Sequence, residues 1–366
     1  MEICMSKILY AASTVSHIRN FHMPYINALR AEGHDVLIMA SGEGADFDIP
    51  LEKKMLSKKN LSLVKQIKRI LKRERFDVVV LNTALSAFYI RLAMPKKNRP
   101  RVVNIVHGYL FGSNTGFFKR NILLLCEKIT KSKTDSVIVM NREDYRIAKY
   151  YSLSLGKVRS IHGMGAVVKP EGLSRKAVRE EMKSEDAWVM LFVGELSARK
   201  NQKMLITALP EIRKTIKNAE LWLVGDGDLR TDLAELAAKL GVIDYVKFAG
   251  VRDNPCDFIR AADVYVTASK IEGMPFNVIE ALGCGATVFA SDVKGHRDLI
   301  EDGVTGFLYP EDDVSIFVSK LVAYKLGMFT VDEEDVLDKY GEYEIEAVFD
   351  NTYSILKEEM KLDGKA

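Results

Sequence analysis

The chain has 366 residues, 48% of them hydrophobic, which is enough for two globular domains with separate cores. Its four cysteines form no Cys-x-x-Cys pair, which argues against a disulfide framework or a cysteine zinc site and for a reducing compartment. The most apolar stretch, residues 78–94, is too short to span a bilayer and is interrupted by Asn82 and Arg91, so we expect a cytoplasmic protein.

The net charge of +3 conceals an asymmetry between the two halves. Residues 1–165 hold 28 Lys and Arg against 13 Asp and Glu, a balance of +15. Residues 166–366 hold 25 against 37, a balance of −12. Such a change of composition is consistent with a domain boundary close to residue 165.

The first half alternates short apolar runs with amphipathic stretches. A first strand is predicted at residues 7–12, then a loop at 13–17 and a helix at 18–32 that Gly33 ends. Further strands are predicted at residues 36–39, 78–81, 102–106 and 136–139. Strands that alternate with helices in this way indicate a parallel sheet covered on both faces.

The alternation breaks at residues 167–175, which contain Pro170 and Gly172 and are typical of a linker. It then restarts, with strands predicted at 189–194, 221–224, 246–248, 264–267 and 287–290 and helices at 204–217, 229–240 and 276–282. We therefore predict an α/β protein with two Rossmann-like domains facing a central cleft, one over residues 1–165 and one over residues 166–344. A helix in residues 345–366 is expected to pack back toward the first domain. Ligands of such sheets bind outside the carboxyl ends of the strands.

The segment from Glu272 to Glu280 is the most informative part of the chain. Glu272 falls in the loop after the strand at 264–267, and Glu280 falls inside the apolar helix at 276–282. The first amides of that helix lack intrahelical partners and can bind a phosphate. A carboxylate inside an apolar helix is costly unless it has a partner, and a ribose diol offers two hydroxyls. A Glu–x7–Glu spacing alone is common by chance, and a loop Glu is usually just solvated, but the flanking residues favour a functional site.

These motifs resemble those of the family 4 retaining glycosyltransferases, which have the GT-B architecture. The resemblance is strongest in GELSARKNQ (194–202), AELWLVGDGDLR (219–230), VKFAGVRD (246–253), Glu272–Glu280 and GHRDLIEDGVTGFLYP (295–310). It is weaker in SHIRNFHMPYINALRAEGHDV (16–36) and VVNIVHG (102–108). Within the family the chain looks most like bacterial capsular and exopolysaccharide enzymes that extend saccharide units on a lipid carrier.

The resemblance implies a set of site residues. Glu272 would hold the hydroxyls of the donor sugar, Lys200 would neutralise its diphosphate, and His107 would lie near the reacting centre in the acceptor domain. Glu280 would hold the ribose. The remaining donor-binding positions that the resemblance implies are Ser16, Gly194, Arg199, Val251, Arg252, Gly273, Met274, Phe276 and Asn277.

One position departs from the family pattern. The family usually has an Arg directly after the Gly of its Gly-Arg-Leu motif, whereas this chain has Glu195. An acid next to a diphosphate is repulsive by about 1 to 4 kcal/mol at 4 Å, depending on the effective dielectric. We expect that Glu195 points away or that Arg199, next to Lys200, supplies the missing charge.

The implied reaction is the retaining transfer of a sugar from a nucleotide sugar, with UDP the favoured nucleotide, to a hydroxyl of a polyprenyl-diphosphate-linked saccharide. No cofactor and no metal are expected. The Gly225-Asp226-Gly227-Asp228 sequence could suggest a metal-binding Asp-x-Asp motif, but a turn before a helix explains it better.

Two other functions are also compatible with the sequence. A nucleotide-sugar 2-epimerase of the same architecture would need no acceptor, and the Glu272–Glu280 segment argues against it. A non-catalytic two-domain sugar-binding protein would need neither a buried Glu280 nor Lys200. Stabilisation by UDP alone would count against the binding protein.

Residues 51–75 carry ten basic and only two acidic residues, interleaved with apolar ones. In the later part, helical spacing puts apolar side chains on one face and Lys65, Lys68, Arg69 and Lys72 on the others, as in a helix that lies on an anionic membrane. We therefore expect peripheral association with the inner face of the plasma membrane. An ordinary solvated helix is the simpler alternative. Nucleic acid is disfavoured because no recognition motif accompanies the charge.

Overall fold

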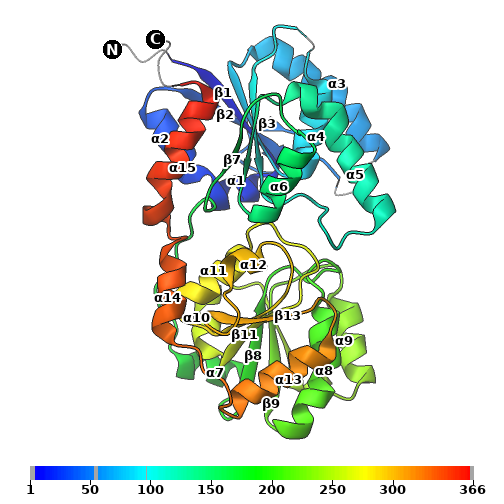
Figure 1. The fold of residues 1–366 in the computed structure, drawn as a ribbon, viewed down its shortest axis with the longest axis vertical. Coiled ribbons are helices and arrows are strands. Elements are labelled where there is room, and N and C mark those ends of the chain that lie inside the picture. Colours follow the sequence, from blue (N-terminus) through cyan, green and yellow to red (C-terminus); the bar gives the residue numbers. More distant parts are fainter. Residues whose placement is uncertain (1–4, 53–56, 96, 363–366) are drawn as a thin grey trace. The chain divides into compact units, whose positions relative to one another are not determined.

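The computed structural model describes residues 5–52, 57–95 and 97–362. The chain forms two compact units, one of residues 1–165 with 345–366 and one of residues 166–344. We call them unit 1 and unit 2; each contains one parallel sheet with helices around it (Figure 1). The predicted α/β class with two parallel sheets is confirmed. Cys4 and part of the basic segment, residues 53–56, lie outside the described residues.

Unit 1 is built on a seven-stranded sheet in the order β3-β2-β1-β4-β5-β6-β7. The strands are β1 Lys7–Thr14, β2 Asp35–Ser41, β3 Phe47–Asp48, β4 Val78–Asn82, β5 Arg101–Val106, β6 Ser136–Val139 and β7 Val158–Ser160. The central strands are apolar almost throughout and buried, because helices cover both of their faces.

The helices of unit 1 are α1 Val15–Phe21, α2 Met23–Ala31, α3 Lys58–Glu74, α4 Ala84–Ala93, α5 Phe117–Thr130, α6 Arg142–Tyr150 and α15 Ile345–Met360. The last of these, red in Figure 1, packs against α2. The ring of its Phe349 stacks on Tyr25, and its Lys357 pairs with Glu32 at 3.0 Å.

The loop predicted at residues 13–17 and the single helix predicted at 18–32 are wrong. Strand β1 continues to Thr14, whose hydroxyl accepts a hydrogen bond from the backbone NH of His17 and caps α1. The helical segment then breaks at His22, and α2 begins at Met23. Pro24 explains the break, since proline is tolerated in the first turn of a helix but not in its interior.

Unit 2 is built on a six-stranded sheet in the order β10-β9-β8-β11-β12-β13. Its strands are β8 Trp188–Val193, β9 Ala219–Val224, β10 Val246–Gly250, β11 Val264–Thr267, β12 Val288–Ser291 and β13 Gly306–Tyr309. The helices are α7 Arg175–Met182, α8 Gln202–Thr215, α9 Arg230–Lys239, α10 Pro255–Ala261, α11 Phe276–Gly283, α12 His296–Leu299, α13 Val314–Lys325 and α14 Glu333–Gly341. Strand order reverses between β8 and β11, the type of switch point where such sheets bind ligands.

Within the described ranges, no helix combines the length and the apolar content that crossing a bilayer requires.

Candidate active site

The donor-site residues predicted in unit 2 gather at the carboxyl edge of its sheet. Gly194 follows β8, Val251 follows β10, and Glu272 lies in the loop between β11 and α11. Because the strands are parallel, these loops emerge at one edge, and those after β8 and β11 flank the switch point.

Two glycines allow the loops after β8 and β9 to touch. A Cβ on Gly225 would lie 2.1 Å from the carbonyl oxygen of Gly194, which no side chain tolerates. Gly225 also has a φ of +130°, a region that favours glycine. The Gly-Asp-Gly-Asp sequence therefore has a structural explanation at its first position, independent of any metal.

Glu272 is buried and pairs with two cations. Its Oε1 lies 2.7 Å from Nζ of Lys200, and its Oε2 accepts a hydrogen bond of 2.9 Å from Nη1 of Arg199. Burial raises the pKa of Glu272, but Lys200 and Arg199 outweigh it, so that the pKa falls to about 2. The carboxylate is therefore ionised at neutral pH, and the three side chains carry a net charge of about +1.

Arg199 and Glu195 differ in their surroundings. Arg199 reaches Glu272 next to Lys200, with its side chain 40% exposed. Glu195 is exposed, and its backbone carbonyl accepts a hydrogen bond from Nε2 of Gln202. The second cation next to Lys200 is therefore Arg199.

Glu280 lies on α11 and is half-buried. No hydrogen bond from the described residues reaches its carboxylate. Burial raises the pKa of Glu280 to about 7, and the charge of Lys169 opposes this shift only in part. Such a group is unfavourable for the protein alone and is suited to a ligand that donates hydrogen bonds to it.

The other predicted residues of unit 2 have mixed surroundings. Asn277 donates hydrogen bonds to the Val193 carbonyl at 2.8 Å and the Tyr265 hydroxyl at 2.7 Å, so it fastens the start of α11 to the end of β8. Arg252 pairs with Glu181 at 2.7 Å. Val251 is 77% exposed. Gly273 and Met274 are buried, and Phe276 is half-buried.

His296 is a further residue of this region that we did not predict from the sequence. It is fully buried, its Nδ1 lies 2.8 Å from the Ser291 carbonyl, and its Nε2 has no hydrogen-bond partner among the described residues. Burial lowers its pKa to about 4, so the ring is neutral and Nε2 is an acceptor when Nδ1 holds the proton. The preceding Gly295 places it against the Glu272 loop, since a Cβ there would lie 2.7 Å from the Gly273 carbonyl oxygen. The Gly-His pair after a buried strand was the available signal.

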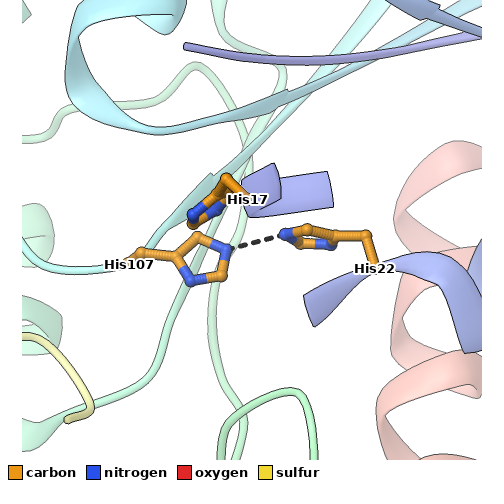
Figure 2. A group of neighbouring side chains, drawn as sticks. All are labelled: His17, His22 and His107. Carbon is orange, nitrogen blue, oxygen red and sulfur yellow. Dashed lines mark hydrogen bonds between the residues drawn. The ribbon is translucent and has the colours of Figure 1, made fainter. Parts of the chain in front are cut away.

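In unit 1, His107 directly follows β5 and meets two other histidines (Figure 2). Its Nε2 lies 2.9 Å from Nε2 of His22, and the ring of His17 packs edge-on at a centroid distance of 4.5 Å. Burial lowers the pKa of His107 and His22 well below 6.5 and that of His17 to about 4. Ser16 is exposed, and its hydroxyl donates to Oγ1 of Thr14.

Comparison with known proteins identifies the chain. The Glycosyltransferase Family 4 model matches residues 25–163, and the Glycosyl transferases group 1 model matches residues 174–324. EpsD of Bacillus subtilis (strain 168), a protein named as a glycosyltransferase, is 30% identical over 330 residues, which are 86% of each chain. The chain is a family 4 glycosyltransferase. The resemblance drawn from the sequence motifs is therefore confirmed.

Further relatives of this glycosyltransferase extend the comparison. The Escherichia coli UDP-Gal:alpha-D-GlcNAc-diphosphoundecaprenol alpha-1,3-galactosyltransferase is 26% identical over 277 residues, 72% of each chain. Among solved structures, Anabaena HepE in complex with UDP-glucose has a TM-score of 0.74 at 17% identity and covers 96% of this chain and 100% of its own. Sucrose-phosphate synthase of Thermosynechococcus elongatus has a TM-score of 0.73 at 19% identity, covering 96% and 98%. These two structures share the fold.

Proposed function

We propose that this glycosyltransferase moves a sugar from a UDP-sugar to a hydroxyl of a polyprenyl-diphosphate-linked saccharide, with retention of anomeric configuration, in the synthesis of a surface polysaccharide. The observation that carries the proposal is the cluster of Glu272, Lys200 and Arg199 at the carboxyl ends of β8 and β11. The E. coli relative is named for the same classes of donor and acceptor.

Lys200 and Arg199 would bind the donor diphosphate together with the start of α11. Its N-cap residue, Pro275, makes no side-chain cap hydrogen bond, and the amino end of a helix carries a positive potential. The two cations share one carboxylate, which leaves positive charge for the phosphates. These groups would stabilise the negative charge that develops on the leaving diphosphate as the bond to the anomeric carbon breaks.

Glu272 and Glu280 would bind donor hydroxyls. Glu272 is ionised and held by two cations, and Nε2 of His296 lies buried near it as a second acceptor for the sugar. The Glu280 carboxylate, with no hydrogen bond of its own among the described residues, would accept two hydrogen bonds from the ribose.

Retention requires that the acceptor oxygen attack the face that the diphosphate leaves. We propose that an oxygen of the leaving phosphate takes the acceptor proton, while the new glycosidic bond forms and the bond to the phosphate breaks. His107 would lie close to the acceptor, and no metal takes part. Membership of family 4 favours transfer over the epimerase and the sugar-binding protein.

Calorimetric titration of UDP, GDP and ADP tests the donor assignment. UDP should bind most tightly, and both Arg199→Ala and Lys200→Ala should weaken it, by roughly 1.5–3 kcal/mol for each lost charged hydrogen bond. Glu195→Ala is the matched control in the same loop and should leave UDP affinity unchanged or higher. Normal UDP binding by Arg199→Ala would remove that residue from the site.

We also propose that unit 1 docks on an anionic membrane through α3 and α5. Lys65, Lys68, Arg69 and Lys72 are exposed on α3, and none of them takes part in an ion pair with a described residue. Helix α5 exposes an apolar stripe at helical spacing: Phe117, Phe118, Ile122, Leu125 and Ile129 are 53% to 82% exposed. Helix α4 contacts both helices (Figure 1). A basic face on one helix and an exposed apolar stripe on another, both packed against α4, fit an interfacial surface.

Flotation with phosphatidylglycerol vesicles tests this docking. Each basic residue near the surface contributes about 1 kcal/mol, so changing the four α3 cations to Glu should abolish most binding at low salt. Phe118→Ser with Ile122→Ser should remove the binding that survives at high salt. Leu326→Ser with Met328→Ser, at exposed apolar positions of unit 2, is the matched control. Equal recovery with neutral and anionic vesicles would contradict the electrostatic part.

A further inference from the structure

The three histidines of unit 1 form a cluster that the proposed reaction does not fully use. His17 lies on α1, His22 at the junction of α1 and α2, and His107 after β5, and one ring nitrogen of each lies within 4.8 Å of the others. Figure 2 shows the rings of His17 and His22 on two sides of His107. The cluster depends on the helix break at His22, because a single continuous helix would carry this residue elsewhere.

The hydrogen bonding of this cluster is incomplete. One proton serves the contact of 2.9 Å between His22 and His107. Nε2 of His17 and Nδ1 of His22 are buried and have no partner among the described residues. Buried polar atoms are nearly always paired, so the unpartnered Nε2 of His17, next to the rings of His22 and His107, indicates that a ligand binds at this point.

The chemistry of the donor set points to a transition metal. A neutral imidazole offers one nitrogen lone pair to a metal ion, and three such rings lie together here. Imidazole is a good ligand for Zn²⁺ and for the copper, iron and nickel ions, whereas Mg²⁺ and Ca²⁺ prefer oxygen ligands. The cluster consists of three histidines and contains no carboxylate. Three histidines with an open fourth position are a known zinc arrangement.

We propose that His17, His22 and His107 form a reversible binding site for Zn²⁺ or a similar divalent transition metal ion. Binding would draw the three nitrogens to about 3.3 Å from one another, the edge of a tetrahedron with zinc–nitrogen distances of about 2.05 Å. The one proton between His22 and His107 would move from Nε2 to the outer Nδ1 of the ring that carries it, so that both rings hold their protons on Nδ1. A histidine that binds zinc usually donates its other ring NH to an acceptor, and among the described residues Nδ1 of His22 has none. The absence of such a partner lowers metal affinity by about 10–100-fold. The ion is therefore exchangeable, not a permanent cofactor.

Such an ion would occupy His107, the residue that the proposed function places near the acceptor. Metal binding would then inhibit transfer, and a chelator would restore it. This consequence rests on the proposed function, whereas the binding of the ion does not.

Titration with Co²⁺, followed by its visible absorption, tests the site without any sugar substrate. The wild-type protein should give the intense bands of tetrahedral Co²⁺, which Zn²⁺ should displace and Mg²⁺ should not. His17→Gln should lower Zn²⁺ affinity by more than about 100-fold, because loss of a ligand costs at least as much as loss of an outer-shell partner. His162→Gln, at an exposed histidine of the same unit, is the matched control and should bind normally.

Chemical modification of the wild-type protein gives a second measurement that does not depend on the folding of a variant. Zn²⁺ should protect His17 from diethylpyrocarbonate, as mapped by mass spectrometry, and should not protect His162. If the wild-type protein gives no tetrahedral Co²⁺ spectrum, or if His17→Gln binds Zn²⁺ as tightly as the wild type, the proposal is wrong.

Discussion

Glu272→Gln is expected to abolish sugar transfer and to destabilise the protein. The substitution leaves Lys200 buried without its counter-ion, and breaking a buried ion pair from one side costs about 3–5 kcal/mol. Because Arg199 is partly exposed, we expect a loss at the low end, about 3 kcal/mol, in the free energy of unfolding at pH 7.

The stabilisation by Glu272 depends on pH. The pKa of Glu272 lies at about 2 in the folded protein, below the ordinary value of 4.5, so the carboxylate stabilises the fold above pH 4.5. That contribution is lost as the pH falls from 4.5 toward 2. Urea unfolding of wild type and variant should therefore differ at pH 7 and converge in acid. Glu211→Gln, which breaks an exposed pair with Lys214, is the control and should cost at most about 1 kcal/mol. A variant as stable as wild type at pH 7 would show that the pair does not hold.

Glu280→Gln is expected to stabilise the protein, in contrast to Glu272→Gln, and to weaken binding of the donor. Burial raises the pKa of Glu280 to about 7, so the folded state is penalised progressively as the pH rises from 4.5 to 7, and the penalty stays constant above pH 7. The glutamine variant should therefore be more stable than wild type at pH 8, by up to about 3 kcal/mol, and equally stable below pH 4.5.

Donor affinity should follow the same carboxylate. Replacing the charged carboxylate that accepts hydrogen bonds from the ribose should weaken donor binding by about 1.5–3 kcal/mol, or about 10–150-fold in the dissociation constant. For the wild type, UDP-glucose affinity should rise between pH 6 and pH 8 as Glu280 ionises, whereas the variant should show a flat profile. Calorimetry with UDP-glucose measures both effects. An equal pH dependence in the two proteins would remove Glu280 from the donor site.

Patterns that are local in the chain could be predicted from the sequence. The strand at residues 264–267 and the helix at 345–360 coincide with β11 and α15, because buried parallel strands and amphipathic helices have clear periodicities. The break at His22 was also a local signal, since Pro24 cannot lie inside a helix, but the amphipathic pattern obscured it.

Contacts between distant residues could not be predicted from one sequence. Arg199 and Glu272 are 73 residues apart, and His22 and His107 are 85 apart, so only the packing of the sheets brings them together. The exposed stripe of α5 was missed for another reason. Apolar residues at helical spacing indicate a buried face as readily as an exposed one, and the chain does not say which face the sheet covers.

Hydrogen–deuterium exchange with and without saturating UDP tests the central claim most directly, because it locates the donor site in the unmodified protein. The claim is that UDP binds at the carboxyl edge of the second sheet, against Arg199, Lys200, the Glu272 loop and α11. UDP should slow exchange in peptides that cover residues 194–202 and 272–283 and leave α13 unchanged. Protection confined to unit 1, or no protection at saturating UDP, would contradict the claim.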